Sequence, residues 1–266
     1  MMATAESSTI CLTVDVEWAC PEVLADLCRL LDERGVRATF FCTHAGIDVG
    51  RHERGLHPNF RPDGDCLKAL AARHGGTLPT DLRTIYGHVV AWFKAFAPEA
   101  CGVRAHSLYY DSQLLRFYRE HGIRYESTYQ LPLAGGLRPF WKEYGIVEMP
   151  IYFNDYFDIK TAATGFDLAS LRLDRPGLKV LNFHPNIVYL NADTEAFYLD
   201  SKAVYGDADR LLARRRHGPG IRELFLRLLD HIAGQRLATA TLAEVDAAWR
   251  QAEPCPWGER PLLDTP

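Results

Sequence analysis

The sequence predicts an α/β fold built on a parallel sheet, and three consecutive segments carry that prediction. Residues 9–14 form a short, apolar run rich in β-branched side chains, which is typical of a buried strand. Pro21 then opens a run of leucines at helical spacing that Gly35 ends. Residues 36–42 form a second apolar strand. A strand, a helix and a strand within about 35 residues make a βαβ unit, which favours a parallel sheet.

The rest of the chain continues this alternation. Residues 51–66 are polar and rich in Gly, Pro and His, which indicates a loop that carries function. Residues 191–219 are polar and Arg-rich without strong periodicity, so we expect a long loop or lid there. Further helices are expected over 66–73, 82–96, 111–122, 221–232 and 242–249, and further strands over 101–108, 125–129, 146–153 and 178–183.

Composition and charge narrow the class of protein. The chain of 266 residues has 47% hydrophobic and 24% charged residues, and no repeat or composition break divides it, so we expect a single globular domain over residues 1–266. Thirty basic against 34 acidic side chains give a net charge of −4, which argues against nucleic-acid binding. Seven cysteines without a CxxC pair, no signal peptide and no transmembrane run predict a reduced protein in the cytoplasm.

Polar side chains follow the apolar strands. In α/β folds the functional groups gather at the carboxyl ends of the strands. Two carboxylates and several imidazoles at one such rim could form a divalent metal site with an acid–base pair. The residues at these places are Asp15, Glu17, His44, Arg104, His106 and His184, to which the loop adds His52 and His57.

Spacing alone leaves several of these roles open. Asp15 and Glu17 would point to one face of a strand, because the side-chain period of a strand is two, but the pair could equally cap the following helix. His52 and His57 are five residues apart, which matches no standard ligand spacing on a helix. His184 is a stronger candidate than an isolated histidine because it follows an apolar run, where a buried imidazole needs a partner. The same argument applies to His106.

The order of these segments resembles that of the polysaccharide deacetylase (NodB homology) family, carbohydrate esterase family 4. The similarity spans most of the chain and is greatest to deacetylase-like proteins of bacterial O-antigen gene clusters. The matching motifs are Thr13-Val-Asp-Val-Glu17, Ala38-Thr-Phe-Phe41, His52-Glu-Arg-Gly-Leu-His57, Val103-Arg-Ala-His106, Leu181-Asn-Phe-His184-Pro and Ala238-Thr-Ala-Thr-Leu-Ala-Glu-Val245.

This resemblance implies a distorted (β/α) barrel of about seven strands with one divalent metal ion, usually Zn²⁺. It also implies hydrolysis of N-acetyl or O-acetyl groups on sugars. Carried over position by position, Asp15 matches the general base, Arg104 the arginine that orients it, and His184 the general acid. His57 matches the first histidine of the family's metal motif.

Two positions depart from the family pattern. The usual metal aspartate falls on Val16, and the usual second metal histidine falls on Arg61. Some relatives place the metal carboxylate two residues after the base, which is Glu17 here, and His106 could replace the lost histidine. We therefore expect Glu17, His57 and His106 to hold the metal.

The expected substrate is an acetylated sugar, either linked to a nucleotide or carried by a lipid-linked glycan. Trp18 and Tyr109 are aromatic side chains that could stack on a sugar ring, and Asn59 is a further candidate for substrate or metal. The sequence predicts no oligomeric state.

Three alternatives remain open. The same fold hosts metal-independent hydrolysis of carbon–nitrogen bonds in cyclic amides and ureides. The departures at Val16 and Arg61 also permit an inactive barrel that binds sugars without turnover. A glycoside hydrolase that uses Asp15 and Glu17 as its acid–base pair ranks last, because such a pair must face each other across a cleft.

Overall fold

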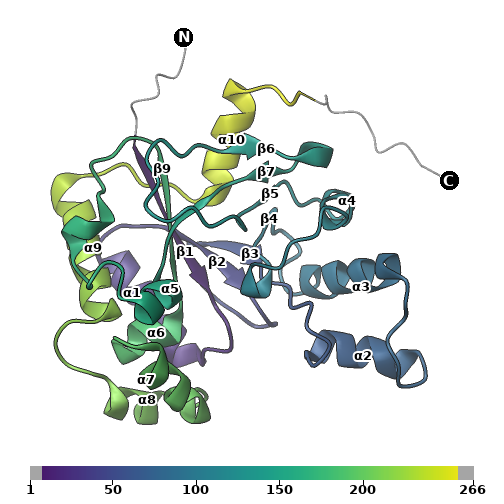
Figure 1. Ribbon diagram of the computed structural model, residues 1–266, viewed down its shortest axis with the longest axis horizontal. Coiled ribbons are helices and arrows are strands. Elements are labelled where there is room, and N and C mark those ends of the chain that lie inside the picture. Colours follow the sequence, from purple (N-terminus) through teal and green to yellow (C-terminus); the bar gives the residue numbers. More distant parts are fainter. Residues whose placement is uncertain (1–7, 257–266) are drawn as a thin grey trace.

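The computed structural model describes residues 8–256, and its centre is one curled sheet (Figure 1). Its strands are β1 Thr9–Asp15, β2 Ala38–Cys42, β3 Glu53–Leu56, β4 Gly102–Val103, β5 Tyr125–Glu126, β6 Phe140–Trp141, β7 Val147–Glu148, β8 Ile151–Asn154 and β9 Leu178–Phe183. Within the described range these nine strands are hydrogen-bonded in the order β6-β7-β5-β4-β3-β2-β1-β9-β8. Only the β6–β7 pair among them is antiparallel.

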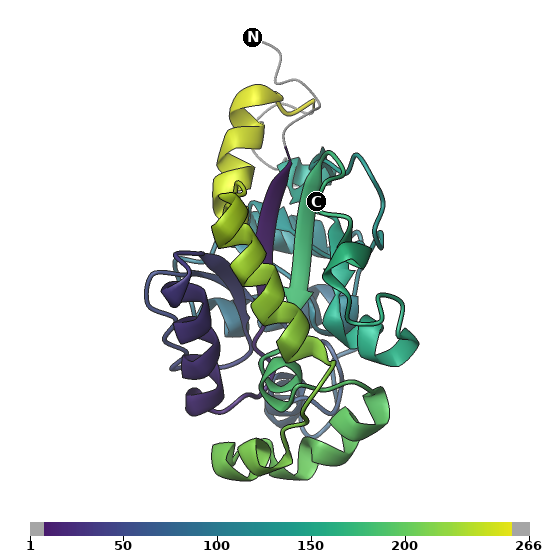
Figure 2. The ribbon, with the colours of Figure 1, turned by 90° about the vertical axis from the view of Figure 1, so that its left-hand side faces the viewer.

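Ten α-helices within residues 8–256 surround the sheet: α1 Pro21–Glu33, α2 Asp65–Arg73, α3 Leu82–Lys94, α4 Leu114–Glu120, α5 Asp155–Thr161, α6 Pro185–Leu190, α7 Glu195–Asp200, α8 Ala208–Arg214, α9 Ile221–Gln235 and α10 Leu242–Ala252. Figure 1 shows α2, α3 and α4 at one end of the row of strands and α1 with α5 to α9 at the other. Figure 2 shows α9 and α10 following one another along one side of the molecule. Across residues 8–256, every helix is too short or too polar to span a membrane.

The row of strands curls back on itself through β7 and β8. Only Met149 and Pro150 separate these two strands, yet β7 pairs with β5 while β8 pairs with β9. The segment after β5 also reaches β8, since the N–H of Ile151 donates to Tyr129 O at 2.8 Å and the N–H of Leu131 donates to Ile151 O at 2.9 Å. With β7 and β8 counted as one broken strand and β6 outside, seven strand positions complete a distorted barrel. The expected fold class is confirmed.

The central strands place the site. All residues of β2 and β9 are buried, as expected for parallel strands covered on both faces, and in β9 these include Lys179 and Asn182. The register pairs Val14 of β1 with Phe40 of β2 and with Phe183 of β9. The carboxyl ends of the three strands therefore lie side by side, so the residues that follow them share one rim.

Two expected loops contain regular structure. The range 51–66 includes β3, which the sequence hides because Glu53 and Arg54 are charged. A Cβ on Gly55 of this strand would lie 2.7 Å from the Phe41 ring, so the absence of a side chain lets β3 pack against β2. The range 191–219 is not a loop but contains α7 and α8, whose first turns are capped by Thr194 and Asp207.

Other bounds differ from the expected ones. The strand expected over 101–108 covers only β4, and the short 3₁₀ turn η1, His106–Leu108, follows it. The strand expected over 146–153 is interrupted at Pro150, which has no N–H to donate to a ladder. The sequence patterns also missed α5 and α6, because helices of seven and six residues show too little periodicity to stand out.

Candidate active site

Asp15 and Glu17 reach the rim by a turn rather than along a strand. β1 ends at Asp15, and Glu17 has a φ of 51°, in the left-handed region that non-glycine residues seldom occupy. The expectation that strand alternation alone puts both carboxylates on one face is therefore wrong, although the turn does bring them to the same cleft. Neither side chain caps the next helix. The N-cap residue of that helix is Cys20, and its side chain makes no capping hydrogen bond.

Asp15 lies in a buried polar network centred on Arg104. Nη1 of Arg104 lies 3.0 Å from Asp15 Oδ1, and Nδ2 of Asn182 donates to Asp15 Oδ2 at 2.8 Å. Nε and Nη2 of Arg104 donate to the carbonyl and the hydroxyl of Ser127, and Nη1 also donates to Thr13 Oγ1. Burial by itself raises the pKa of Asp15, but Arg104, the imidazoles of His57 and His184 and the amide of Asn182 together outweigh it, and the pKa lies below its ordinary value. Asp15 is therefore a carboxylate at neutral pH.

His184 follows β9 and contacts a second buried carboxylate. Its Nδ1 lies 2.5 Å from Asp155 Oδ1, and its backbone N–H donates to Asp155 Oδ2 at 2.7 Å. Its Nε2 lies 3.7 Å from Asp15 Oδ2. Burial lowers the pKa of His184, but the Asp155 carboxylate more than reverses this and raises the pKa to about 9. His184 is therefore protonated at neutral pH and has a proton to donate.

Sequence reasoning missed Asp155. It directly follows β8, at the same rim as Asp15 and His184, so the rule that polar residues follow strands could have found it. The interruption of the expected strand at Pro150 obscured where that strand ends. Burial raises the pKa of Asp155, although both of its oxygens bond to His184.

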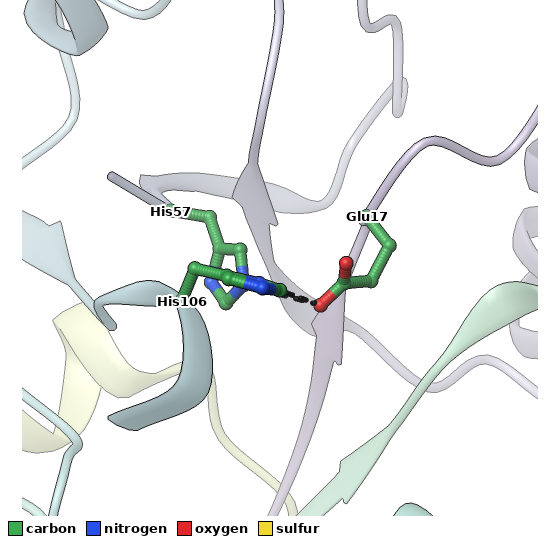
Figure 3. A group of neighbouring side chains, drawn as sticks. All are labelled: Glu17, His57 and His106. Atoms are coloured by element: carbon green, nitrogen blue, oxygen red, sulfur yellow. Dashed lines mark hydrogen bonds and ion pairs between the residues drawn. The ribbon is translucent and has the colours of Figure 1, made fainter. Parts of the chain in front are cut away.

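Glu17, His57 and His106 come together from three strand ends (Figure 3). Glu17 Oε1 lies 3.1 Å from His106 Nδ1 and 3.5 Å from His57 Nε2. The three side chains each offer one ligand atom within 4.8 Å of the others. His57 follows β3, and His106 opens η1, where its N–H bonds to Pro58 O at 2.9 Å. Pairing of neighbouring strands thus fixes the distance between the two imidazoles.

This group fits a divalent metal ion. His57 is 1% exposed, and within the described residues neither of its ring nitrogens has a hydrogen-bond partner. Buried polar atoms normally have a partner, so Nε2, which faces Glu17 Oε1, is available to a ligand, while Nδ1 lies 3.8 Å from Asp15 Oδ1. Burial opposes ionisation of Glu17, but a hydrogen bond from His106 and the contact with His57 hold its pKa well below the ordinary value. One carboxylate and two imidazoles form a donor set that zinc accepts with an open position.

The two positions that depart from the family pattern do not join this group. Val16 is buried in the apolar core. Arg61 is exposed, and its Nη2 donates to Ser107 Oγ at 2.9 Å. His52 is also remote from the group, since its Nδ1 accepts the backbone N–H of Ala38 at 3.3 Å.

The three expected substrate residues differ in their surroundings. Trp18 is 53% exposed and its ring lies edge-on to His106, with 5.5 Å between the ring centres. The hydroxyl of Tyr109 instead lies 2.9 Å from that of Tyr86. Asn59 Oδ1 accepts a backbone N–H of its own loop at 3.0 Å. Of the three, Trp18 is the one that presents an open ring beside the His106 imidazole.

A cleft of about 350 Å³ opens over these groups. The range 191–219, expected as a lid, supplies one wall of it through Tyr198 of α7 and Lys202 of the next 3₁₀ turn, η4 Ser201–Val204. The cleft is also lined by residues described above, namely Asp15, Glu17, Arg61, His106, Ser107 and His184. The acid–base pair and two of the three metal-binding side chains, Glu17 and His106, thus face the same space, and the buried His57 lies behind them.

Comparison with known proteins identifies a family with this fold. A family model described as WbmS-like polysaccharide deacetylase matches residues 12–202. A crystal structure from Bordetella bronchiseptica, of a candidate polysaccharide deacetylase involved in O-antigen biosynthesis, is similar at 27% identity and a TM-score of 0.69, over 84% of this chain and 90% of that one. A candidate polysaccharide deacetylase from Mycobacterium smegmatis shares the fold at 15% identity and a TM-score of 0.57, over 100% of this chain and 97% of that one. No curated protein matches the chain.

Proposed function

The chain belongs to the WbmS-like polysaccharide deacetylase family, and we propose that it is a metal-dependent hydrolase that removes an acetyl group from an amino sugar or another acetylated sugar. The observation that supports this most strongly is the cleft lined by an ionised carboxylate, a protonated imidazole and two of the three metal-binding side chains. The likeness to the Bordetella protein supports a role in surface polysaccharide (O-antigen) biosynthesis. A nucleotide-linked sugar or a lipid-linked glycan would then be the substrate.

Glu17, His57 and His106 would hold the metal, with Zn²⁺ the first candidate. A divalent ion bound there supplies Lewis acidity, which polarises the acetyl carbonyl and makes a nearby water easier to deprotonate. His57 Nε2 faces Glu17 Oε1, has no hydrogen-bond partner among the described residues and can accept such an ion. The same ion would give the buried Glu17 carboxylate a cationic partner.

Asp15 is the proposed general base. Because Arg104 keeps its carboxylate ionised, Asp15 can take the proton of a water molecule as the water oxygen attacks the acetyl carbon. Arg104 is itself fully buried and bonded on several sides, so it fixes the position of the carboxylate as well as its charge.

His184 is the proposed general acid. It is protonated below about pH 9, and its Nε2 faces the cleft side of Asp15. As the bond between the acetyl carbon and the sugar nitrogen or oxygen breaks, the Nε2 proton passes to that leaving atom, and acetate and the free amine or hydroxyl result. Asp155 stabilises the imidazolium and fixes the ring through Nδ1. Trp18, whose exposed ring lies edge-on to His106, would stack on the sugar beside that imidazole.

Metal content and acetate release together test the proposal. Purified wild type should bind about one divalent ion per chain and His57→Ala should not, because a structural or catalytic site needs all its ligands. Wild type should then release acetate from N-acetylated or O-acetylated sugars. Hydrolysis of cyclic ureides by metal-free protein would point instead to the amidase chemistry of the same fold. Sugar binding without turnover, even after metal loading, would indicate an inactive barrel.

A further inference from the structure

Two cationic side chains enter the catalytic cleft from different walls. Arg61 lies on the loop after β3, and Lys202 lies on η4. Both are exposed, and both line the same cleft of about 350 Å³ as Asp15 and His184. They come from segments about 140 residues apart in the chain, so the fold rather than a local basic run brings them together.

Neither cation is neutralised by a side chain in the part of the chain that the structure describes. Within residues 8–256, neither Arg61 nor Lys202 forms an ion pair. Arg61 is nevertheless oriented, because its Nη2 bonds to Ser107 Oγ at 2.9 Å, beside His106. Its other N–H groups remain available. The Lys202 ammonium lies 5.8 Å from the centre of the Tyr198 ring, which also lines the cleft.

The acidic groups of the cleft, in contrast, have partners within the protein. Asp15 is paired with Arg104, and Glu17 faces the imidazoles of His57 and His106. The carboxylate behind the cleft, Asp155, bonds to His184. The two rim cations are therefore in excess, although the whole chain carries a net charge of −4. A local positive field in an acidic protein attracts an anion to that place.

We propose that the cleft recognises a sugar that carries a negatively charged oxyacid group next to the acetylated ring, and that Arg61 and Lys202 bind this group. The inference rests on the proposed function and adds a charge requirement to it. Arg61 presents a planar fork suited to two oxygens of one anion, and Lys202 adds a point charge from the other wall. A phosphate ester at C1 and a carboxylate at C6 share this chemistry.

Equilibrium binding separates the charge requirement from turnover. The ligands are N-acetylglucosamine, its 1-phosphate, its uridine diphosphate derivative and N-acetylglucosaminuronic acid. They are titrated by calorimetry into metal-loaded Asp15→Asn protein, in which hydrolysis is blocked. Arg61→Gln and Lys202→Gln are then added to this background. Lys68→Gln and Arg73→Gln on the exposed side of α2 serve as controls, because they change the net charge equally outside the cleft.

At least one charged ligand should bind about three- to tenfold more tightly than the neutral sugar, in line with one or two exposed charge-assisted contacts. Arg61→Gln and Lys202→Gln should each remove much of this preference, the control variants should keep it, and Arg61→Lys should restore part of it. Preference for the phosphate ligands would identify a nucleotide- or lipid-linked sugar, and preference for the uronate a carboxylated sugar.

Equal affinity for neutral and charged sugars would overturn the inference. It would also be overturned if the α2 control variants lost as much of the preference for charged ligands as Arg61→Gln and Lys202→Gln. Acetate release by the wild type is measured separately. Hydrolysis of a neutral sugar without charge preference would leave the proposed function in place and refute only the charge requirement. Preference for charged ligands without hydrolysis would support the charge requirement and refute the proposed function.

Discussion

His184 Nδ1 lies 2.5 Å from Asp155 Oδ1, and this contact determines the charge of the imidazole. Burial alone would favour the neutral ring, yet the carboxylate raises the pKa of His184 to about 9. The other ring nitrogen points toward Asp15, 3.7 Å away. The proton donor His184 and the proton acceptor Asp15 thus lie next to each other in the cleft.

Asp155→Asn should move the high-pH limb of the activity profile to lower pH. The protonated, active form of His184 exists below its folded-state pKa of about 9 and is lost above it. Without the Asp155 anion, burial dominates and the pKa falls, so at pH 8 we expect kcat to drop about tenfold or more. The profile of kcat against pH measures this. Asp158→Asn is the control, since Asp158 is a buried carboxylate of the same helix that bonds to Thr164.

Asp15→Asn should reduce turnover by about 10²–10⁴-fold while the metal stays bound. Asp15 pairs with Arg104 and Asn182 rather than joining the Glu17 group, so its loss removes the base and spares the ligands. Acetate release and elemental analysis of the same preparation check both parts. Loss of the metal from this variant would show that base and ligand had been exchanged.

Zinc should raise the unfolding temperature of the wild type but not that of His57→Ala. A ligand at 100 times its Kd stabilises a folded protein by about 2.7 kcal/mol. Glu17→Gln and His106→Ala should weaken zinc binding by more than about tenfold. Even mutation of a residue that only hydrogen-bonds to a metal ligand reduces metal affinity by about that factor. His52→Ala is the matched control, and an equal effect there would remove His106 from the ligand set.

Lys142→Met should destabilise the fold, and more so at pH 8 than at pH 5. The Lys142 ammonium bonds to the buried carboxylates of Glu126 and Glu148, and stranding two buried anions costs about 3–5 kcal/mol. Burial and the nearby Glu148 raise the pKa of Glu126 from 4.5 to about 7. The folded state therefore binds this proton more tightly, so stability falls as pH rises from about 4.5 through 7.

Removal of the Lys142 cation raises the pKa of Glu126 further, so the fall in stability becomes larger and extends to higher pH. Urea unfolding at the two pH values measures it, with the exposed Lys160→Met as control. A loss in Lys142→Met that is the same at both pH values would contradict the assignment of the buried charges.

Hydrophobic patterns along the sequence predicted the buried strands and the longer helices of the fold. The strands β1 and β2 were predicted from short, largely apolar runs, because parallel strands are buried on both faces. The helix α1 stood out because five of its residues, at helical spacing, are buried. In contrast, β3 and α7 were hidden, because a short segment carries too few positions for a period to appear.

The site residues were likewise predicted only in part from the sequence. The sequence alone determined which residues stand at strand ends, and this was enough to name Asp15, Glu17 and His184. Only the tertiary structure decided that a left-handed turn brings Glu17 to within 3.5 Å of His57, and that Asp155 holds His184 protonated. Such contacts join segments far apart in the chain, and their distances depend on strand register and backbone turns. Residue type and spacing do not encode either of these directly.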